Sequence, residues 1–159
     1  MKNRAVIIGV NSFSGSAFAH YLLEKKFSVI GFSRSKIEKP FYLRFNKNEK
    51  KFSFFKKDLN SDIEFIIKKI KKFKPNYIIN YAAQSMVGES WENPQDWLKT
   101  NSYSMPLFYN EIFKLKNKIR LVHISTPEVY GNVKNKLIEN ENYKPSTPYA
   151  LSRVTADQY

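Results

Sequence analysis

The fold of this chain is decided near its amino end, where residues 5–15 read AVIIGVNSFSG. Ala5 to Val10 is a short, β-branched, apolar run, which is typical of a buried strand. The small residues from Gly9 to Gly15 then lead directly into Ser14 to Lys26, whose apolar residues recur at helical spacing. A strand, a tight turn and a helix in direct succession predict the first unit of an α/β fold.

The same alternation of strands and helices continues along the chain. Further strands are predicted at residues 28–33, 52–55, 76–81 and 119–124, the last of them as a buried strand, and further helices at 62–74, 95–116 and 152–159. The helix at 95–116 should be broken or bent near Pro106, and residues 34–51 should form a connector. Parallel strands need crossover helices, which cover both faces of a sheet. We therefore predict one domain over residues 1–159, built on a doubly wound, Rossmann-like parallel sheet.

Composition narrows the classes of function. With 27 Lys and Arg against 14 Asp and Glu the chain carries a formal charge of +13, which suits nucleic acid, acidic lipid or a phosphorylated ligand. No recognition helix, zinc-finger spacing or RNA-binding aromatic pattern accompanies the charge, so we expect no nucleic-acid partner. The absence of cysteine favours a reducing compartment, by default the cytoplasm. No segment predicts a membrane span or a signal peptide, and His20 and His123 lack a second metal ligand at useful spacing.

Two turns near the amino end suit a dinucleotide. Small residues from Gly9 to Gly15 let backbone amides approach a pyrophosphate at the positive end of a helix, although a tight turn without a ligand would look the same. The second strand ends in Ser33-Arg34-Ser35, where an NAD enzyme usually presents a carboxylate to the ribose. Arginine instead favours a 2′-phosphate, so the sequence favours NADP over NAD. The alternative is that Arg34 is a solvated loop residue.

The last third of the chain brings a hydroxyl, a carboxylate, a phenol and a cation together. Ser125 and Thr126 follow the strand at 119–124, and Glu128 comes two residues later. Tyr149 and Arg153 are four residues apart, which places them one turn apart on one helical face. A fixed cation lowers the pKa of a phenol and prepares it to act as a base near neutral pH. The alternative is an ordinary surface Tyr and Arg.

These motifs together resemble the extended short-chain dehydrogenase/reductases, in particular the NAD-dependent epimerase/dehydratase family that acts on nucleotide sugars. The landmarks that carry the resemblance fall in order along nearly the whole chain: Gly9 to Gly15, Asp58-Leu59, Asn80 to Ser85, Ser125 to Gly131 and Pro148 to Arg153. Within the family, the similarity is greatest to the 4,6-dehydratases of GDP-mannose and dTDP-glucose.

The resemblance implies a role for each matching residue. By similarity, the residues that would bind NADP or NAD are Gly9, Ser12, Phe13, Gly15, Ser33, Arg34, Asp58, Leu59, Ala82, Ala83, Gln84, Tyr149 and Arg153. Those that would contact the sugar are Ser85, Val87, Ser90 and Thr126. Thr126 would hold the sugar 4-hydroxyl, Tyr149 would take its proton beside Arg153, and Glu128 would be the base at C5. The implied activity is 4,6-dehydration through a 4-keto intermediate.

Four positions depart from the family pattern. Ser12 replaces a glycine, Met86 stands where dehydratases often have histidine, Pro127 replaces the aspartate of the dTDP-glucose enzymes, and Arg153 replaces a lysine. A 4-epimerase or reductase, which needs no base at C5, and a non-catalytic nucleotide-binding module are therefore alternatives. Family members continue well past Tyr159, so we expect a partial sequence with an exposed apolar sheet edge, and a homo-oligomer when the protein is full length.

Overall fold

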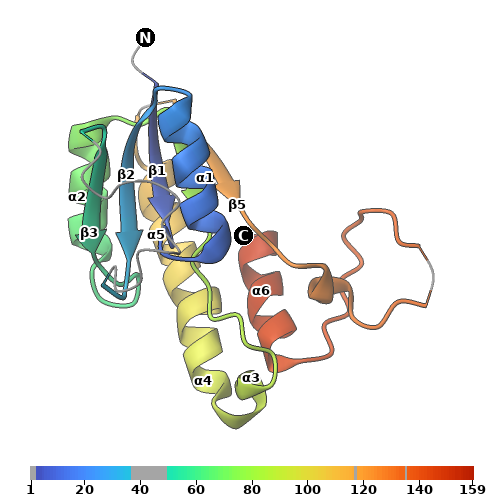
Figure 1. Cartoon of the computed structure of the whole chain (residues 1–159). Coiled ribbons are helices and arrows are strands. Elements are labelled where there is room, and N and C mark those ends of the chain that lie inside the picture. The colour runs from blue at the N-terminus through green and yellow to red at the C-terminus, as the bar shows by residue number, and fades with distance from the viewer. Residues whose placement is uncertain (1–2, 37–49, 117, 135) are drawn as a thin grey trace. The chain divides into compact units, whose positions relative to one another are not determined.

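The computed structural model describes residues 3–36, 50–116, 118–134 and 136–159 (Figure 1). The chain forms two compact units. The first comprises Met1–Ala82 and Glu111–Ile124, and the second comprises Ala83–Asn110 and Ser125–Tyr159. The first unit contains the whole sheet, and the second contains the segments that follow its last two strands in the sequence. The interpretation of residues 1–159 as one domain stays a prediction.

The sheet is five-stranded and parallel, which confirms the predicted fold class. Its strands are β1 (Arg4–Ile8), β2 (Ser28–Ser33), β3 (Phe52–Lys56), β4 (Tyr77–Asn80) and β5 (Arg120–His123). They pair in the order β3-β2-β1-β4-β5. The chain therefore builds outward from β1 first on one side and then on the other. Ligands of doubly wound sheets bind at the carboxyl ends of the strands where this reversal occurs, here between β1 and β4.

Two helices of the first unit lie on opposite faces of the sheet. They are α1 (Phe13–Glu24) and α2 (Ile63–Phe73). Figure 1 shows α1 in front of the sheet beside β1, and α2 behind β3. This follows from right-handed crossovers, because the chain moves in opposite directions along the sheet from β1 to β2 and from β3 to β4. Ala19 and Leu22 of α1 share a buried core with Ala5, Ile7 and Val29 of the strands.

Helix α2 has the amphipathic character that its sequence predicts. Ile66, Ile67 and Ile70 are buried, and Lys68 and the lysines of the last turn are exposed. Lys69 instead places its ammonium 4.5 Å from the centre of the Phe55 ring on β3, where the ring face attracts a cation. Most of the positive charge on this helix is therefore a solvated face, as the sequence indicated.

Strand β5 differs from its prediction, because it is an edge strand and not a buried one. Its exposed residues alternate with half-buried ones, and Val122 is 37% exposed. Ile124, just beyond the strand, is 39% exposed. Among the described residues no strand pairs with the outer edge of β5. The apolar run was therefore a correct signal for a strand, and the expected exposed apolar sheet edge is present.

The long helix predicted at 95–116 is interrupted before Pro106 and ends at Phe113. The structure has α3 (Glu89–Glu92), α4 (Pro94–Trp97), a π-helical segment η2 (Leu98–Ser104) and α5 (Met105–Phe113). Pro106 has no amide hydrogen to give to the carbonyl four residues earlier, and its ring crowds that carbonyl. A wider π turn before the proline relieves this conflict. The predicted break near Pro106 is therefore present, as a π-helical segment that ends two residues before the proline.

The last helix begins one turn earlier than predicted. After a short 3₁₀ helix, η3 (Pro127–Tyr130), α6 runs over Pro148–Gln158. Thr147 caps α6, because its hydroxyl accepts the Ala150 amide hydrogen at 3.0 Å, and Pro148 takes the first helical position. Both Tyr149 and Arg153 therefore lie within one helix. None of the helices in the described ranges is long and apolar enough to cross a bilayer.

Candidate functional site

The glycine turn after β1 leaves no room for side chains at two positions. Gly9 has a φ of +78°, and a Cβ there would lie 2.6 Å from the backbone nitrogen of Ala82. A Cβ at Gly15 would lie 2.4 Å from the carbonyl oxygen of Gly9. The turn after β1 therefore lies close against the backbone after β4, at the point where the strand order reverses. This is where the fold offers backbone amides to a ligand.

Ser12 begins helix α1. Its hydroxyl accepts the Gly15 amide hydrogen at 3.0 Å, which makes it the N-cap. The hydroxyl that replaces the family's glycine thus stabilises the turn, a contribution that the sequence reasoning did not foresee. The first turn of α1 carries no acidic residue, so the partial positive charge at its amino end is not neutralised there. Such a helix end suits a pyrophosphate.

The turn after β2 is joined to the glycine turn. Ser33, the last residue of β2, is buried, and its hydroxyl accepts the Asn11 amide hydrogen at 3.0 Å. Arg34 follows directly and is exposed. The sequence has no carboxylate between Ser33 and Lys36. The hydroxyl and the guanidinium that are predicted to bind a 2′-phosphate therefore belong to adjacent residues at the carboxyl end of β2.

The turn after β3 is held by carboxylates. Asp58 accepts the Asn60 amide hydrogen at 2.9 Å, and Leu59 is buried. Asp62 accepts the Asp58 amide hydrogen at 3.0 Å and forms an ion pair of 2.7 Å with Lys57. The hydrogen bond from Lys57 and then that from the Asp58 amide hold the pKa of Asp62 below its ordinary value of 3.8. Asp62 therefore orders the loop that carries the predicted adenine contacts.

The substitution Asp62→Asn is expected to destabilise the protein in a pH-dependent way. Because the pKa of Asp62 is lowered by folding, its carboxylate stabilises the folded state above pH 3.8, and this contribution is lost as the pH falls through the lowered pKa. Thermal unfolding at pH 7 should show a loss of about 1 kcal/mol or less, as for other partly exposed ion pairs. At pH 3 the difference between the variant and the wild type should be smaller than at pH 7, and it should vanish only below the lowered pKa of Asp62. Glu64→Gln, which removes the same charge from an exposed position on α2, is the matched control. An equal loss at both pH values would contradict the assignment.

The segment after β4 is fixed by two buried asparagines. Within the first unit, Asn80 accepts the Ala82 amide hydrogen at 2.9 Å. Within the second, Asn101 of η2 accepts the Gln84 amide hydrogen and donates to the Gln84 carbonyl oxygen, both at 3.0 Å. Asn101 also donates to the Ser152 hydroxyl at 2.9 Å. Ala83 is half-buried beside Gln84. The residues predicted to flank the nicotinamide therefore have a defined backbone.

Tyr149 and Arg153 are both buried in the second unit. Tyr149 is 8% exposed and Arg153 is 2% exposed, one turn further along α6. Ser90 fixes the start of this helix, because its hydroxyl accepts the Tyr149 amide hydrogen at 3.1 Å and donates to the Val87 carbonyl oxygen at 2.6 Å. The prediction that Tyr149 and Arg153 lie one turn apart on one helix is thus confirmed. The surface alternative is wrong for this pair, and the catalytic roles stay predictions.

The residues predicted to contact the sugar differ in exposure. Ser85 is exposed, Val87 is half-buried and Ser90 is fully buried with its hydroxyl hydrogen given to Val87. Thr126 is half-buried, and its hydroxyl accepts the Glu128 amide hydrogen at 3.4 Å at the start of η3. Ser85, Val87 and Thr126 therefore have accessible atoms, whereas Ser90 has a structural role in the same unit. Substrate contact stays a prediction for all four.

Glu128 is half-buried in the first turn of η3. The loop that leads to it is tied to α6, because the Ser125 hydroxyl donates to the carboxylate of Asp157. Nothing in the local sequence indicates this bond, since the two residues are 32 positions apart. The carboxylate, the threonine hydroxyl and α6 thus belong to one connected unit.

Two other tyrosines of the chain are poor candidates for a base. Burial raises the pKa of Tyr81 above its ordinary value of 10.0. Burial, and then the negative charge of Asp157 and the neighbouring Tyr130, raise the pKa of Tyr143 in the second unit. Both phenols therefore stay protonated near neutral pH. Tyr149 differs from both in having a cation, Arg153, one turn away on its own helix.

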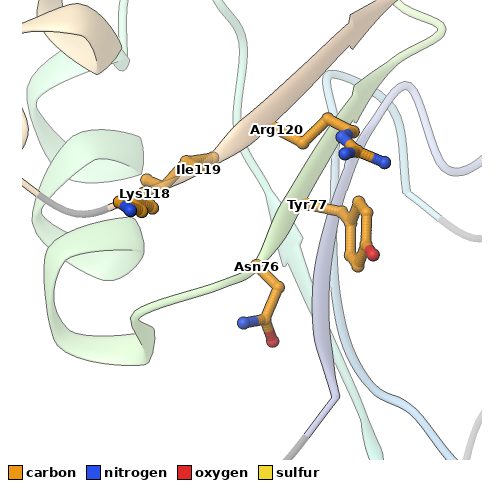
Figure 2. Close-up of a pocket in the computed structure, with 5 residues that line it drawn as sticks. All are labelled: Asn76, Tyr77, Lys118, Ile119 and Arg120. Carbon is orange, nitrogen blue, oxygen red and sulfur yellow. The ribbon is translucent and has the colours of Figure 1, made fainter.

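An open hollow lies at the opposite ends of the strands. It is lined by Asn76, Tyr77, Lys118, Ile119 and Arg120, at the amino ends of β4 and β5. Figure 2 shows Tyr77 and Arg120 pointing to one side of these strands and Lys118 pointing to the other. The two cations therefore do not converge on one point. The hollow includes none of the predicted site residues.

Comparison with known proteins identifies the family. A family model described as GDP-mannose 4,6 dehydratase matches residues 6–159. The chain belongs to this family. It is 29% identical to the GDP-mannose 4,6-dehydratase of Yersinia enterocolitica over 96% of this chain and 43% of that protein. The predicted membership of the NAD-dependent epimerase/dehydratase family is thereby confirmed.

Solved structures of the family share the fold. A dTDP-glucose 4,6-dehydratase from Bacillus anthracis in complex with NAD is 25% identical, with a TM-score of 0.80 over 98% of this chain and 48% of that one. The UDP-N-acetylglucosamine 4-epimerase of Methanobrevibacter ruminantium is 26% identical, with a TM-score of 0.84 over 100% of this chain and 50% of that one. The chain spans about half the length of the curated relatives it matches. Dehydratases and epimerases therefore resemble this chain about equally.

Proposed function

We propose that this family member transforms a nucleotide sugar with a bound nicotinamide dinucleotide, and that its reaction is a 4,6-dehydration through a 4-keto intermediate. The observation that carries the proposal is the buried pair Tyr149 and Arg153 on one face of α6, in a chain whose first unit has the glycine turn of a dinucleotide site. A phenol beside a cation is what proton removal from a hydroxyl requires.

The residues of the first unit fit the dinucleotide. Gly9 and Gly15 let the turn after β1 fold tightly against the backbone of Ala82 and of Gly9, which supports a turn whose amides can approach a pyrophosphate, and the amino end of α1 supplies positive charge there. Ser33 and Arg34 suit a 2′-phosphate, so we propose NADP as the cofactor. The solved dehydratase from Bacillus anthracis is in complex with NAD, which makes NAD the alternative. Asp58 and Leu59 would line the adenine.

The side chains of the second unit supply the acid–base chemistry. Thr126 would hold the sugar 4-hydroxyl, and Tyr149 would take its proton, while Arg153 stabilises the phenolate. The chemistry that a dinucleotide would supply when bound is hydride transfer, away from C4 and later back to C6, with no net consumption of the cofactor. The 4-keto group acidifies the hydrogen at C5. Glu128 would remove that proton and pass it to the C6 hydroxyl, which leaves as water. Hydride at C6 and a proton at C5 would then complete the 4-keto-6-deoxy sugar.

A 4-epimerase or reductase is the second candidate. It needs the threonine and the tyrosine but no base at C5, and Pro127 stands where the dTDP-glucose enzymes carry an aspartate. The similarity to the Methanobrevibacter ruminantium epimerase favours this reading as much as the dehydratase similarity opposes it. Glu128 decides our preference, because dehydration needs a base at C5 and epimerisation does not. A non-catalytic module would bind the dinucleotide and form no product.

The full-length protein should bind one of the two dinucleotides and convert a nucleotide sugar. We expect saturable binding in fluorescence titrations with NADPH and NADH, followed by a 4-keto-6-deoxy product from GDP-mannose or dTDP-glucose. Gly15→Ala should raise the dissociation constant of the dinucleotide by at least about tenfold, the cost of one good contact. Gly88→Ala is the matched control, because a Cβ there meets nothing within 4 Å.

Three outcomes separate the candidates. A wild-type protein that binds neither dinucleotide rules out hydride chemistry and the proposal with it. Binding without any change of the sugar supports the non-catalytic module. Binding with inversion at C4 and no loss of water supports the epimerase. The cytoplasmic location and the homo-oligomer stay predictions.

A further inference from the structure

One residue of the glycine turn makes three hydrogen bonds to the turn after β2. The backbone amide of Asn11 donates to the Ser33 hydroxyl at 3.0 Å. Its side-chain amide donates to the carbonyl oxygen of Ser35 at 3.0 Å and to that of Lys36 at 3.2 Å. Both hydrogens of the side-chain amide therefore have acceptors in the same short turn. All of these residues belong to the first unit.

The two turns meet different parts of a dinucleotide. In this type of fold the turn after the first strand receives the pyrophosphate, and the residues after the second strand receive the 2′ position of the adenosine ribose. The backbone of Asn11 belongs to the glycine turn after β1, but its side-chain amide donates hydrogen bonds to the turn after β2. The carbonyl groups it holds lie on the residues that directly follow Arg34. Asn11 thus fixes the backbone that carries the Arg34 side chain.

Fixing that backbone favours recognition of a 2′-phosphate. After Ser33 the chain leaves the strand and forms an exposed turn. A turn that becomes ordered only when the ligand binds has a lower affinity for that ligand than a turn that is already ordered. An arginine recognises a phosphate best when its planar donors are preorganised. The pyrophosphate contacts, by contrast, depend on Gly9 and Gly15, whose positions the Asn11 side chain does not touch.

We propose that Asn11 is a positioning residue that sets the preference for a 2′-phosphorylated over an unphosphorylated dinucleotide, by clamping the turn of residues 33–36 to the glycine turn. The inference rests on the proposed function, because it assumes that the first unit binds a nicotinamide dinucleotide. Asn11 lies within the Gly9 to Gly15 stretch but is not among the residues that the family resemblance assigns to the cofactor. Loss of the side chain should weaken binding of the phosphorylated cofactor selectively.

The test measures dissociation constants of the full-length protein and its Asn11→Ala variant for NADPH and NADH, and for 2′,5′-ADP and ADP. We expect the variant to bind NADPH and 2′,5′-ADP about tenfold more weakly, and NADH and ADP within about twofold of the wild type. Asn142→Ala, an asparagine removed from an exposed position in the second unit, is the matched control. Asn11→Ser, which is too short to reach both carbonyl groups, replaces the alanine variant should that one fail to fold.

A double-mutant cycle with Arg34→Ala distinguishes positioning from general stabilisation. If Asn11 acts by holding the turn that presents Arg34, then Asn11→Ala should not lower the NADPH preference further once Arg34 is absent. A merely structural role would weaken both cofactors equally and would overturn the inference. So would an unchanged ratio, or a wild type that prefers NADH, although both leave the proposed function standing. A wild type that binds neither dinucleotide overturns the proposed function and this inference together.

Discussion

Tyr149→Phe is expected to lower the kcat of the full-length protein by about a hundred- to ten-thousandfold, the range that positioned acid–base groups contribute. The substitution keeps the ring that packs in the second unit, where Tyr149 is 8% exposed, and removes only the hydroxyl. Arg153, one turn away on α6, then has no phenolate to stabilise. Turnover should be measured with the nucleotide sugar that the wild type converts.

The matched control for this prediction is Tyr143→Phe. Tyr143 lies in the same unit, but burial and the nearby Asp157 carboxylate raise the pKa of its phenol, so it does not ionise near neutral pH. We expect that variant to keep nearly full activity. A Tyr149→Phe enzyme that retained more than about a tenth of wild-type kcat would exclude Tyr149 as the base, because that loss is smaller than general-base catalysis contributes.

Glu128→Gln is expected to lower the rate of dehydration by a similar factor, about a hundred- to ten-thousandfold, while oxidation at C4 survives. Glutamine keeps the size of the side chain and the bond between the residue 128 amide and the Thr126 hydroxyl, but it cannot take the C5 proton. The bound cofactor should therefore become reduced on addition of the sugar and stay reduced. Its absorbance, together with product analysis, measures both steps.

Glu139→Gln serves as the control for the loss of one negative charge, since Glu139 is exposed in the same unit. Dehydration that continued at the wild-type rate in Glu128→Gln would refute the role of this carboxylate. Inversion at C4 that persisted without any loss of water in the wild type would instead establish the epimerase. The experiment thus distinguishes 4,6-dehydration from 4-epimerisation, which the similarity to known proteins does not separate.

Functional contacts that sequence reasoning missed join residues far apart in the chain. Ser90 and Tyr149 are 59 positions apart, and Asn101 and Ser152 are 51 apart. The sequence around a helical asparagine or serine does not indicate its hydrogen-bond partner when that partner lies on a distant element, because the bond forms only when the two elements pack together. The start of α6 was different. Thr147-Pro148 is a local cap signal, and it would have placed the first turn correctly.

Local patterns determined most of the secondary structure. The strand over Ser28–Ser33 matches its prediction at both ends, and the isoleucine stripe of α2 is buried as its spacing requires. Apolar periodicity and glycine placement are properties of short segments, so they can be read without the fold. The π-helical segment before Pro106 could not be read, since the proline shows where hydrogen bonding fails but not how the neighbouring turns absorb the failure.

The sequence by itself determined the alternating fold, the glycine turn and the order of the landmarks that define the family, because each depends on neighbours in the chain. The tertiary structure alone decided that β5 lies at an edge, that Tyr149 and Arg153 are buried, and that Asn11 bonds the turn after β2. Burial and hydrogen bonding between distant segments depend on which elements pack together. Which elements pack together depends on all of them at once, so it cannot be determined from any single segment of the sequence.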